Sequence, residues 1–136
     1  MLKCMQKIII ASGPVIVEDG KVLLNKHGDT EFWKFCGGKV EDSSESLIDA
    51  AKRELREEMG VECNITNQDP FIMYTKKTTA DGDIDVILVH FLGERVGEVR
   101  PGTDIREWRW VEFSELNKED LAPNILPALK YFGFIK

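Results

Sequence analysis

The spacing of hydrophobic and polar positions in the first part of the chain predicts strands. Apolar residues dominate positions 8–17 and return over 21–26, with a strong turn signal, Asp19-Gly20, between the two runs. Residues 32–35 are rich in aromatic side chains and predict a short third strand. We therefore expect a hairpin followed by one more strand.

The spacing changes to a helical period at residue 45. Apolar side chains recur every three or four positions over residues 45–59, which predicts an amphipathic helix. Strand patterns return over 63–75, 84–92 and 108–111, and residues 125–132 predict a closing helix. Because helices interrupt the strands, we expect a mixed fold of the α/β or α+β class.

The size and charge of the chain narrow the class of protein. A length of 136 residues fits one globular domain, residues 1–136, and 43% hydrophobic residues is typical of a folded protein. The 24 acidic side chains outnumber the 18 basic ones and give a formal charge of −6. We expect no nucleic acid and no membrane among the partners, because both attract basic patches.

The thiols and imidazoles indicate neither disulfides nor zinc. Cys4, Cys36 and Cys63 form no CxxC pair, and the two histidines are His27 and His90. Three scattered thiols fit a reducing compartment, so we expect a cytoplasmic protein. No apolar run approaches the roughly 18 residues that a membrane-spanning helix needs.

The helix predicted over residues 45–59 carries three acids near its apolar side. At 100° per residue, Glu54 and Glu58 fall beside Leu47, and Glu57 lies about one step round. Acids at the edge of a buried face are costly unless something neutralises them. Mg²⁺ prefers oxygen ligands and often bridges carboxylates to phosphates, so this grouping favours a cation site.

Neighbouring residues support the same interpretation. Arg53 can reach Glu57 at i, i+4, and Gly37-Gly38 lets the backbone approach a ligand closely. Residues 41–58 contain seven acids and three bases, so much of the acidic excess surrounds one helix. The alternative is an ordinary solvated helix with Glu/Arg pairs, which is what charge runs usually mark.

Residues 37–61 resemble the Nudix box of the Nudix hydrolases, commonly written G-x5-E-x7-R-E-U-x-E-E-x-G-U with U aliphatic. Positions 53–61 match at every fixed residue. The first half differs: counted back from position 53, the first Glu of the pattern falls on Glu45 and its Gly falls on Lys39. The loop between Gly38 and Glu45 is therefore one residue longer than in the family pattern.

Both flanks of the box agree with the resemblance. Residues 33–38 are similar to the W-x-F-P-G-G entry of the family, with Cys36 in place of Pro. Residues 108–111, followed by Glu115-Leu116, resemble the strand and turn after the family's variable loop.

The resemblance implies a fold and a reaction. The implied fold is an α/β/α sandwich with a central mixed sheet, built as a single domain. The implied reaction is hydrolysis of a nucleoside diphosphate linked to another moiety, through metal-activated water attack on phosphorus. Mg²⁺ is the expected cofactor, Mn²⁺ can substitute, and a small-molecule nucleotide is the expected partner. A monomer or a homodimer is expected.

The resemblance also implies residue roles. The expected metal ligands are three acids and one backbone carbonyl: Glu54, Glu57, Glu58 and Gly38. The expected catalytic residues are Glu57, Arg53, Glu54 and Asp104. The general base comes either from the box or from a later acid, for which Glu98, Asp104 and Glu107 are available. Asp104 fits the mutator-type branch best by its spacing to Trp108, and an ordinary loop acid is the alternative.

The expected substrate follows from the absence of residues that are typical of two branches of the family. The ADP-ribose branch has a Pro sixteen positions after Val61, where this chain has Lys77, and the Tyr typical of the dinucleoside polyphosphate branch is absent there too. A nucleoside triphosphate, with oxidised purine nucleotides included, is the leading expectation. The alternatives are an ADP-ribose or nucleotide-sugar pyrophosphatase and a non-catalytic nucleotide-sensing module.

The predicted substrate-binding residues are Gly37, Lys39, Glu41, Asn124 and Phe35. In mutator-type enzymes an Asn placed like Asn124 reads a purine edge, for which an amide offers a donor and an acceptor. The alternative for Asn124 is the N-cap of the final helix. Phe32, Trp33 and Phe35 could stack on a base, or could belong to the core.

Overall fold

A computed structural model describes residues 7–136 of the chain, and Cys4 lies outside them. It contains six strands, two α-helices and one 3₁₀ helix, η1. Their bounds are β1 Ile8–Glu18, β2 Lys21–His27, β3 Gly38–Lys39, α1 Leu47–Met59, β4 Glu62–Thr79, β5 Gly82–Val96, β6 Ile105–Glu112, η1 Phe113–Lys118 and α2 Ile125–Tyr131.

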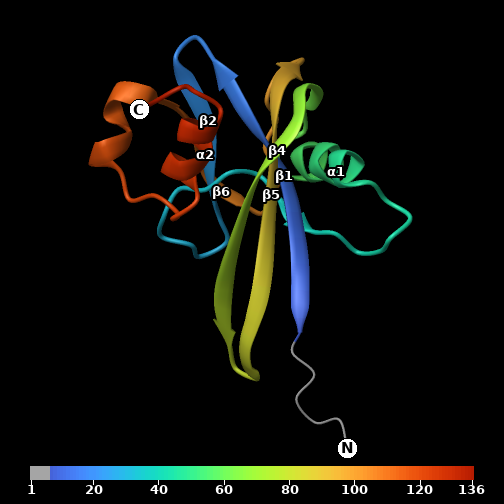
Figure 1. The fold of residues 1–136 in the computed structure, drawn as a ribbon. Helices are drawn as coiled ribbons and strands as arrows, with labels where there is room; N and C mark the ends of the chain where they lie inside the picture. Colours follow the sequence, from blue (N-terminus) through green and yellow to red (C-terminus); the bar gives the residue numbers. More distant parts are fainter. Residues whose placement is uncertain (1–6) are drawn as a thin grey trace, which may run out of the picture.

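The six strands form one mixed sheet in the order β4-β5-β1-β2-β6, and the short β3 pairs with β1 (Figure 1). β1 pairs with β5 in parallel, whereas the pairs β1–β2, β2–β6, β4–β5 and β1–β3 are antiparallel. The predicted turn between β1 and β2 is present. Asp19 and Gly20 both take positive φ angles, 51° and 76°, which suit a tight hairpin turn.

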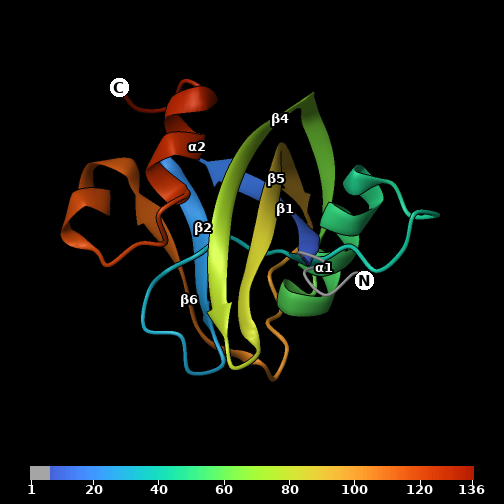
Figure 2. The same cartoon turned by 60° about the horizontal axis from the view of Figure 1, so that its bottom comes forward.

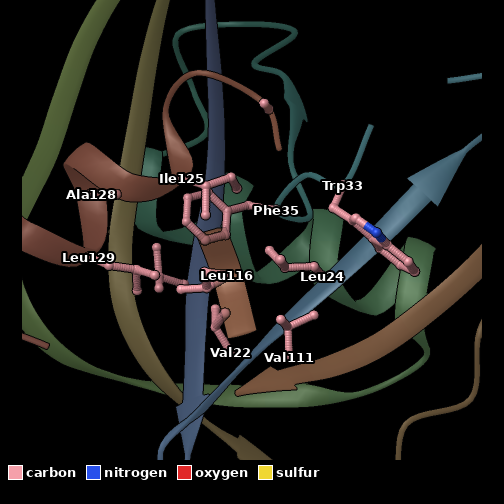
Figure 3. Close-up of a cluster of buried hydrophobic side chains, with 11 residues drawn as sticks. Val22, Leu24, Trp33, Phe35, Val111, Leu116, Ile125, Ala128 and Leu129 are labelled. Carbon is pink, nitrogen blue, oxygen red and sulfur yellow. The ribbon is translucent and has the colours of Figure 1, made fainter. Parts of the chain in front are cut away.

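Helices cover both faces of the sheet, α1 on one side and α2 with η1 on the other (Figures 1 and 2). Neighbouring residues of β1 point to opposite sides, because side chains alternate along a strand. Val15 belongs to a buried cluster with Ile125 and Leu129 of α2 (Figure 3), and Ile16 belongs to one with Leu55 of α1. The expected α/β/α sandwich is therefore confirmed.

Four elements differ from the sequence-based expectation. Residues 32–35 form no strand, only single bridges from Trp33 to Leu121 and from Lys34 to Asn25. β4 and β5 extend well beyond 63–75 and 84–92, because each pairs with the other along a long hairpin. The first helix begins at residue 47, one residue after its cap. Within residues 7–136 no helix is long and apolar enough to cross a membrane.

Candidate active site

Both ends of helix α1 are set by residues that cap a helix. The Ser46 hydroxyl oxygen accepts a hydrogen bond from the Asp49 N–H at 3.0 Å and caps the first turn. Gly60 takes the left-handed conformation at φ 63° and donates its N–H to Arg56 O at 3.0 Å. The helix is thus fixed over thirteen residues that include the three acids expected as metal ligands.

The buried side of α1 brings its acids to the edge of the sheet. Leu55 and Met59 are fully buried, and Glu54 is only 9% exposed. The Ser12 hydroxyl donates to Leu47 O at 2.7 Å, which attaches α1 to β1. The carboxylate of Glu54 is therefore held against the protein and largely shielded from solvent.

Gly37 and Gly38 pass directly beside these acids. The Gly37 N–H donates to Glu58 Oε1 at 3.2 Å. A Cβ added at Gly38 would overlap both carboxylate oxygens of Glu54. A side chain at position 38 would therefore displace the Glu54 carboxylate from its place beside the backbone. The Gly-Gly pair is expected from the sequence to let the backbone approach a ligand, and in the structure the groups that this backbone approaches are the acids of α1.

A pocket of about 440 Å³ lies between α1 and the loop that precedes β6. We call it the acidic pocket, because four carboxylates line it together with the glycine pair: Glu54, Glu57, Glu58, Asp104, Gly37 and Gly38. Of the three later acids considered from the sequence, Asp104 lines this pocket. Glu98 instead faces Arg100, at 3.9 Å, and Glu107 faces Lys26, at 3.5 Å.

The loop that carries Asp104 is tied to the end of α1. The Arg100 N–H donates to Met59 O at 2.7 Å, and the Gly102 N–H donates to Glu58 O at 2.8 Å. The last carbonyls of a helix have no partner within the helix, so the loop satisfies two of them. This backbone pairing explains why an acid far from the box in sequence reaches the box acids in space.

Arg53 connects the box acids to one another. Its guanidinium meets Glu45 through two bonds of 2.7 and 3.1 Å, Glu54 at 3.1 Å and Glu57 at 3.3 Å. The hydrogen bonds from Arg53 lower the pKa of Glu45. Glu45 is therefore oriented toward Arg53 despite the longer loop before it. The predicted Arg53–Glu57 contact is present and belongs to a network of four side chains.

Two acids of the pocket are held in an environment that disfavours their charge. Burial, with a smaller contribution from the repulsion of Glu54, raises the pKa of Glu58 to about 7. Burial also raises the pKa of Glu54, with a smaller contribution from Glu57. A positive charge placed among these carboxylates would relieve both the desolvation and the repulsion.

The donor set of the acidic pocket fits a hard divalent cation such as Mg²⁺, because its side-chain donors are carboxylate oxygens. Within residues 7–136, no three His, Cys, Asp or Glu side chains are already gathered as a metal site. Arg53 pairs with Glu54 and Glu57, while the Gly37 N–H binds Glu58. Cation binding would therefore exchange Arg53 contacts for metal contacts at two of the acids.

A second pocket of about 450 Å³ lies on the other side of the glycine pair. We call it the apolar pocket, since strand side chains such as Ile9, Ala11, Val86 and Leu88 line much of it. Polar groups of His90, Asn124, Lys39 and Lys77 also line it, and so do Gly37 and Gly38. The two pockets therefore share the glycine pair as a common wall.

The side chain of Asn124 faces His90 and does not cap α2. Asn124 precedes the first residue of α2, yet its side chain makes no capping hydrogen bond. Its Nδ2 lies 2.9 Å from His90 Nε2, and the residue is 7% exposed at the apolar pocket. This geometry disfavours the capping interpretation and leaves the amide available to a ligand.

The other predicted substrate-binding residues differ in whether they line the apolar pocket and in how exposed they are. Phe35 lines the apolar pocket but is buried, with its ring edge-on to His90 at 4.9 Å, whereas Phe32 at the same pocket is 40% exposed. Lys39 is exposed and lines the pocket. Glu41 is exposed and lines neither the acidic nor the apolar pocket. Phe32 is therefore the better-placed aromatic ring for stacking.

Three pocket residues carry no signal in the sequence alone. His27 and Thr103 line the acidic pocket, and His90 lines the apolar pocket. A register shift between Lys26 and His27 pairs His27 with Ile105 and so brings it beside the loop before β6. Such a bulge depends on the partner strand, so the residue pattern of β2 does not reveal it.

His90 is expected to contribute stability to the folded protein that is present above about pH 6.5 and is lost toward pH 4. Burial lowers the pKa of His90 from 6.5 to about 4. Between these values the unfolded chain binds a proton that the folded protein does not, so stability present above pH 6.5 falls by about 2–3 kcal/mol toward pH 4. Urea unfolding of wild type and His90→Gln at pH 7 and pH 4.5 isolates this loss, because the opposite contribution of Glu58 is common to both proteins. Going from pH 7 to pH 4.5, wild type should lose about 2–3 kcal/mol relative to His90→Gln, and an equal change in the two proteins would contradict the assignment.

Comparison with known proteins decides the family. The NUDIX domain family model matches residues 8–132. The chain belongs to the Nudix hydrolase family. Relatives of this Nudix hydrolase include proteins named nucleoside triphosphatase NudI, from Escherichia coli O139:H28 (strain E24377A / ETEC) and from Shigella flexneri. Each is 31% identical over 134 residues, which covers 90% of this chain and 94% of the relative.

Solved structures agree with the fold of this Nudix hydrolase. The solution structure of the E. coli ORF135 protein has a TM-score of 0.73 at 28% identity and covers 97% of this chain and 93% of its own. The crystal structure of MutT protein from Methanosarcina mazei Go1 has a TM-score of 0.76 at 26% identity and covers 94% of each chain. The predicted family, fold class and hydrolase activity are confirmed.

Proposed function

We propose that this Nudix hydrolase cleaves a nucleoside triphosphate to the nucleoside monophosphate and pyrophosphate, with Mg²⁺ as cofactor and Mn²⁺ as a substitute. The observation that carries this proposal is the common wall of the two pockets, formed by Gly37 and Gly38. One ligand can lay a phosphate chain in the acidic pocket and a flat base in the apolar pocket. The name of the NudI relatives, nucleoside triphosphatase, supports this substrate class.

The residues of α1 would hold the cation. Glu54, Glu57 and Glu58 supply carboxylate oxygens, and the Gly38 carbonyl is the proposed backbone ligand. When bound, the cation neutralises phosphate charge and lowers the pKa of a bound water. Before the cation binds, Arg53 holds Glu54 and Glu57 in place through its ion pairs. The rigid helix keeps these donors in a fixed relation to the glycine wall.

The reaction forms one bond and breaks another at phosphorus. A water oxygen bonds to the α- or β-phosphorus, the bond from that phosphorus to the oxygen bridging the two breaks, and pyrophosphate or the nucleoside monophosphate leaves. The proton of the water passes to a carboxylate. Glu57 of α1 and Asp104 of the opposite loop are the two candidates for this base, because both line the acidic pocket.

Product analysis over a substrate panel tests the proposal. The panel contains ribonucleoside and deoxyribonucleoside triphosphates, 8-oxo-dGTP, ADP-ribose and a nucleotide sugar, each with Mg²⁺, with Mn²⁺ and with chelator. We expect monophosphate and pyrophosphate in equal amounts from a triphosphate, only with metal. The Glu57→Gln protein is the control for contaminating activity. Turnover confined to ADP-ribose or the nucleotide sugar, or release of orthophosphate, would contradict the proposal.

A further inference from the structure

His90 lies at the centre of a buried hydrogen-bond chain beside the apolar pocket. It belongs to β5 and is only 4% exposed. Its Nδ1 lies 3.1 Å from the Gly13 carbonyl oxygen of β1, and its Nε2 lies 2.9 Å from Asn124 Nδ2. The ring of Phe35 packs against it edge-on at 4.9 Å. Contacts on three sides therefore fix the position of the imidazole.

The partner at Nδ1 determines which nitrogen carries the proton. The Gly13 carbonyl oxygen can only accept a hydrogen bond, so His90 Nδ1 must be the donor. Burial holds the pKa of His90 at about 4, so the ring is neutral near pH 7 and has a single N–H. His90 Nε2 is therefore an acceptor without a proton.

An acceptor at His90 Nε2 in turn fixes the amide of Asn124. The amide must direct its Nδ2–H toward the imidazole, because its carbonyl oxygen would face another acceptor. The Asn124 backbone is held as well, since its carbonyl oxygen accepts from the Ala128 N–H at 3.1 Å in the first turn of α2. Within residues 7–136 no hydrogen bond from the protein occupies Asn124 Oδ1, which leaves this oxygen for a ligand in the apolar pocket.

We propose that His90 is a specificity-determining positioning residue, which locks the Asn124 amide so that it presents a carbonyl oxygen to the nucleotide base. The inference rests on the proposed function, because it assumes that the apolar pocket receives the base. A base that has an N–H opposite Asn124 Oδ1 is accepted, and a base that has a lone pair there is rejected. Without His90 the amide can rotate and offer either group, so the pocket loses its ability to distinguish bases.

The state of the His90 ring can be measured in the unaltered protein. Long-range proton–nitrogen NMR correlation at pH 7 distinguishes the two neutral tautomers and the imidazolium. We expect a neutral ring with the proton on Nδ1. A proton on Nε2, or a doubly protonated ring, would overturn the inference, because the amide would then have to present its nitrogen to the pocket.

Three variants test the consequence for specificity. The readout is the ratio of kcat/KM between the best and the worst of ATP, GTP, CTP and UTP, with unfolding curves for each protein. We expect a wild-type ratio of at least about ten-fold, which one well-placed hydrogen bond can supply. His90→Phe removes the acceptor, so the ratio should fall about ten-fold, which brings a wild-type ratio of about ten to unity. Asn124→Ala should lower the ratio by the same factor. His90→Gln offers an amide oxygen near the place of Nε2 and should restore most of the ratio.

These outcomes separate the inference from the proposed function. If no nucleoside triphosphate is hydrolysed by the wild type, the proposed function fails, and the tautomer measurement still decides the His90 geometry. If the wild type discriminates and His90→Phe, folded, keeps the full ratio while Asn124→Ala loses it, the inference alone fails. A merely structural role for His90 predicts lower stability in both His90 variants with an unchanged base ratio.

Discussion

Replacing Glu58 by Gln is expected to lower kcat by at least about a hundred-fold and to stabilise the fold at the same time. The carboxylate of Glu58 lines the acidic pocket and is one of the three proposed side-chain ligands of the cation. An amide carries no negative charge and binds Mg²⁺ poorly, so both cation affinity and turnover should fall. Steady-state kinetics over a Mg²⁺ titration measure this effect.

The stabilisation follows from the pKa of Glu58. Its folded value, about 7, lies above the ordinary 4.5, so the folded protein favours the protonated form. The protonated Glu58 side chain therefore stabilises the folded protein below pH 4.5, and this contribution is lost as the pH rises through 7. At pH 8 the ionised side chain costs the metal-free protein up to about 3 kcal/mol, which a neutral Gln avoids. Gln can also keep the hydrogen bond from the Gly37 N–H.

A matched control distinguishes the site from general charge effects. Glu62 is an exposed acid just after α1 that pairs with Arg56 at 2.7 Å and does not line the acidic pocket. Glu62→Gln should change kcat by less than two-fold, about what removal of a surface ion pair produces. Near-normal turnover in Glu58→Gln, or lower stability at pH 8 in metal-free buffer, would contradict the assignment.

Replacing Gly13 by Ala is expected to destabilise the fold by about 3 kcal/mol or more. A Cβ at this position would overlap the Cys36 carbonyl oxygen and lie 2.7 Å from Gly37 Cα. These are main-chain atoms, so no side-chain rotation can relieve the overlap, and the cost should reach the upper end for overpacked sites. Urea unfolding with the linear extrapolation method measures it.

The same change should also impair the site. Moving the segment of Cys36 and Gly37 away from β1 would shift the wall that the two pockets share. Gly37→Ala is the matched comparison, because its Cβ would meet Ser12 O at 3.2 Å, a contact that small shifts can relieve. We expect Gly37→Ala to lower the free energy of unfolding by about 1 kcal/mol. Equal stability of Gly13→Ala and wild type would show that this close approach does not support the fold.

The sequence alone was informative wherever the interactions are local. The helical period of residues 45–59 involves neighbours within one or two turns, and the caps that the structure adds at Ser46 and Gly60 are also local. The Arg53–Glu57 contact follows from the same period, because residues four apart meet on a helix. The hairpin turn at Asp19-Gly20 is equally local. The helix that carries the box acids, and their positions on it, could therefore be predicted from residue order.

The aromatic segment shows where local pattern is insufficient. Residues 32–35 have strand propensity, yet Trp33 is held by groups outside this segment, two of them remote in sequence. Lys26 and Arg109 lie over its ring at 4.7 and 4.9 Å, and its Nε1 donates to Glu119 at 3.2 Å. Strand propensity describes a fit to a pleated surface, and here the packing around one side chain decides the conformation instead.

By itself, the sequence determined the fold class, the first helix and the pattern of acids along it, since helical periodicity acts through neighbouring residues. The tertiary structure alone decided what surrounds them. The loop pairing that brings Asp104 to the acidic pocket, the close approach of Gly13 to Cys36, and the His90–Asn124 contact join residues 23 or more positions apart. Such contacts depend on strand order and register, which fix where distant backbone segments meet.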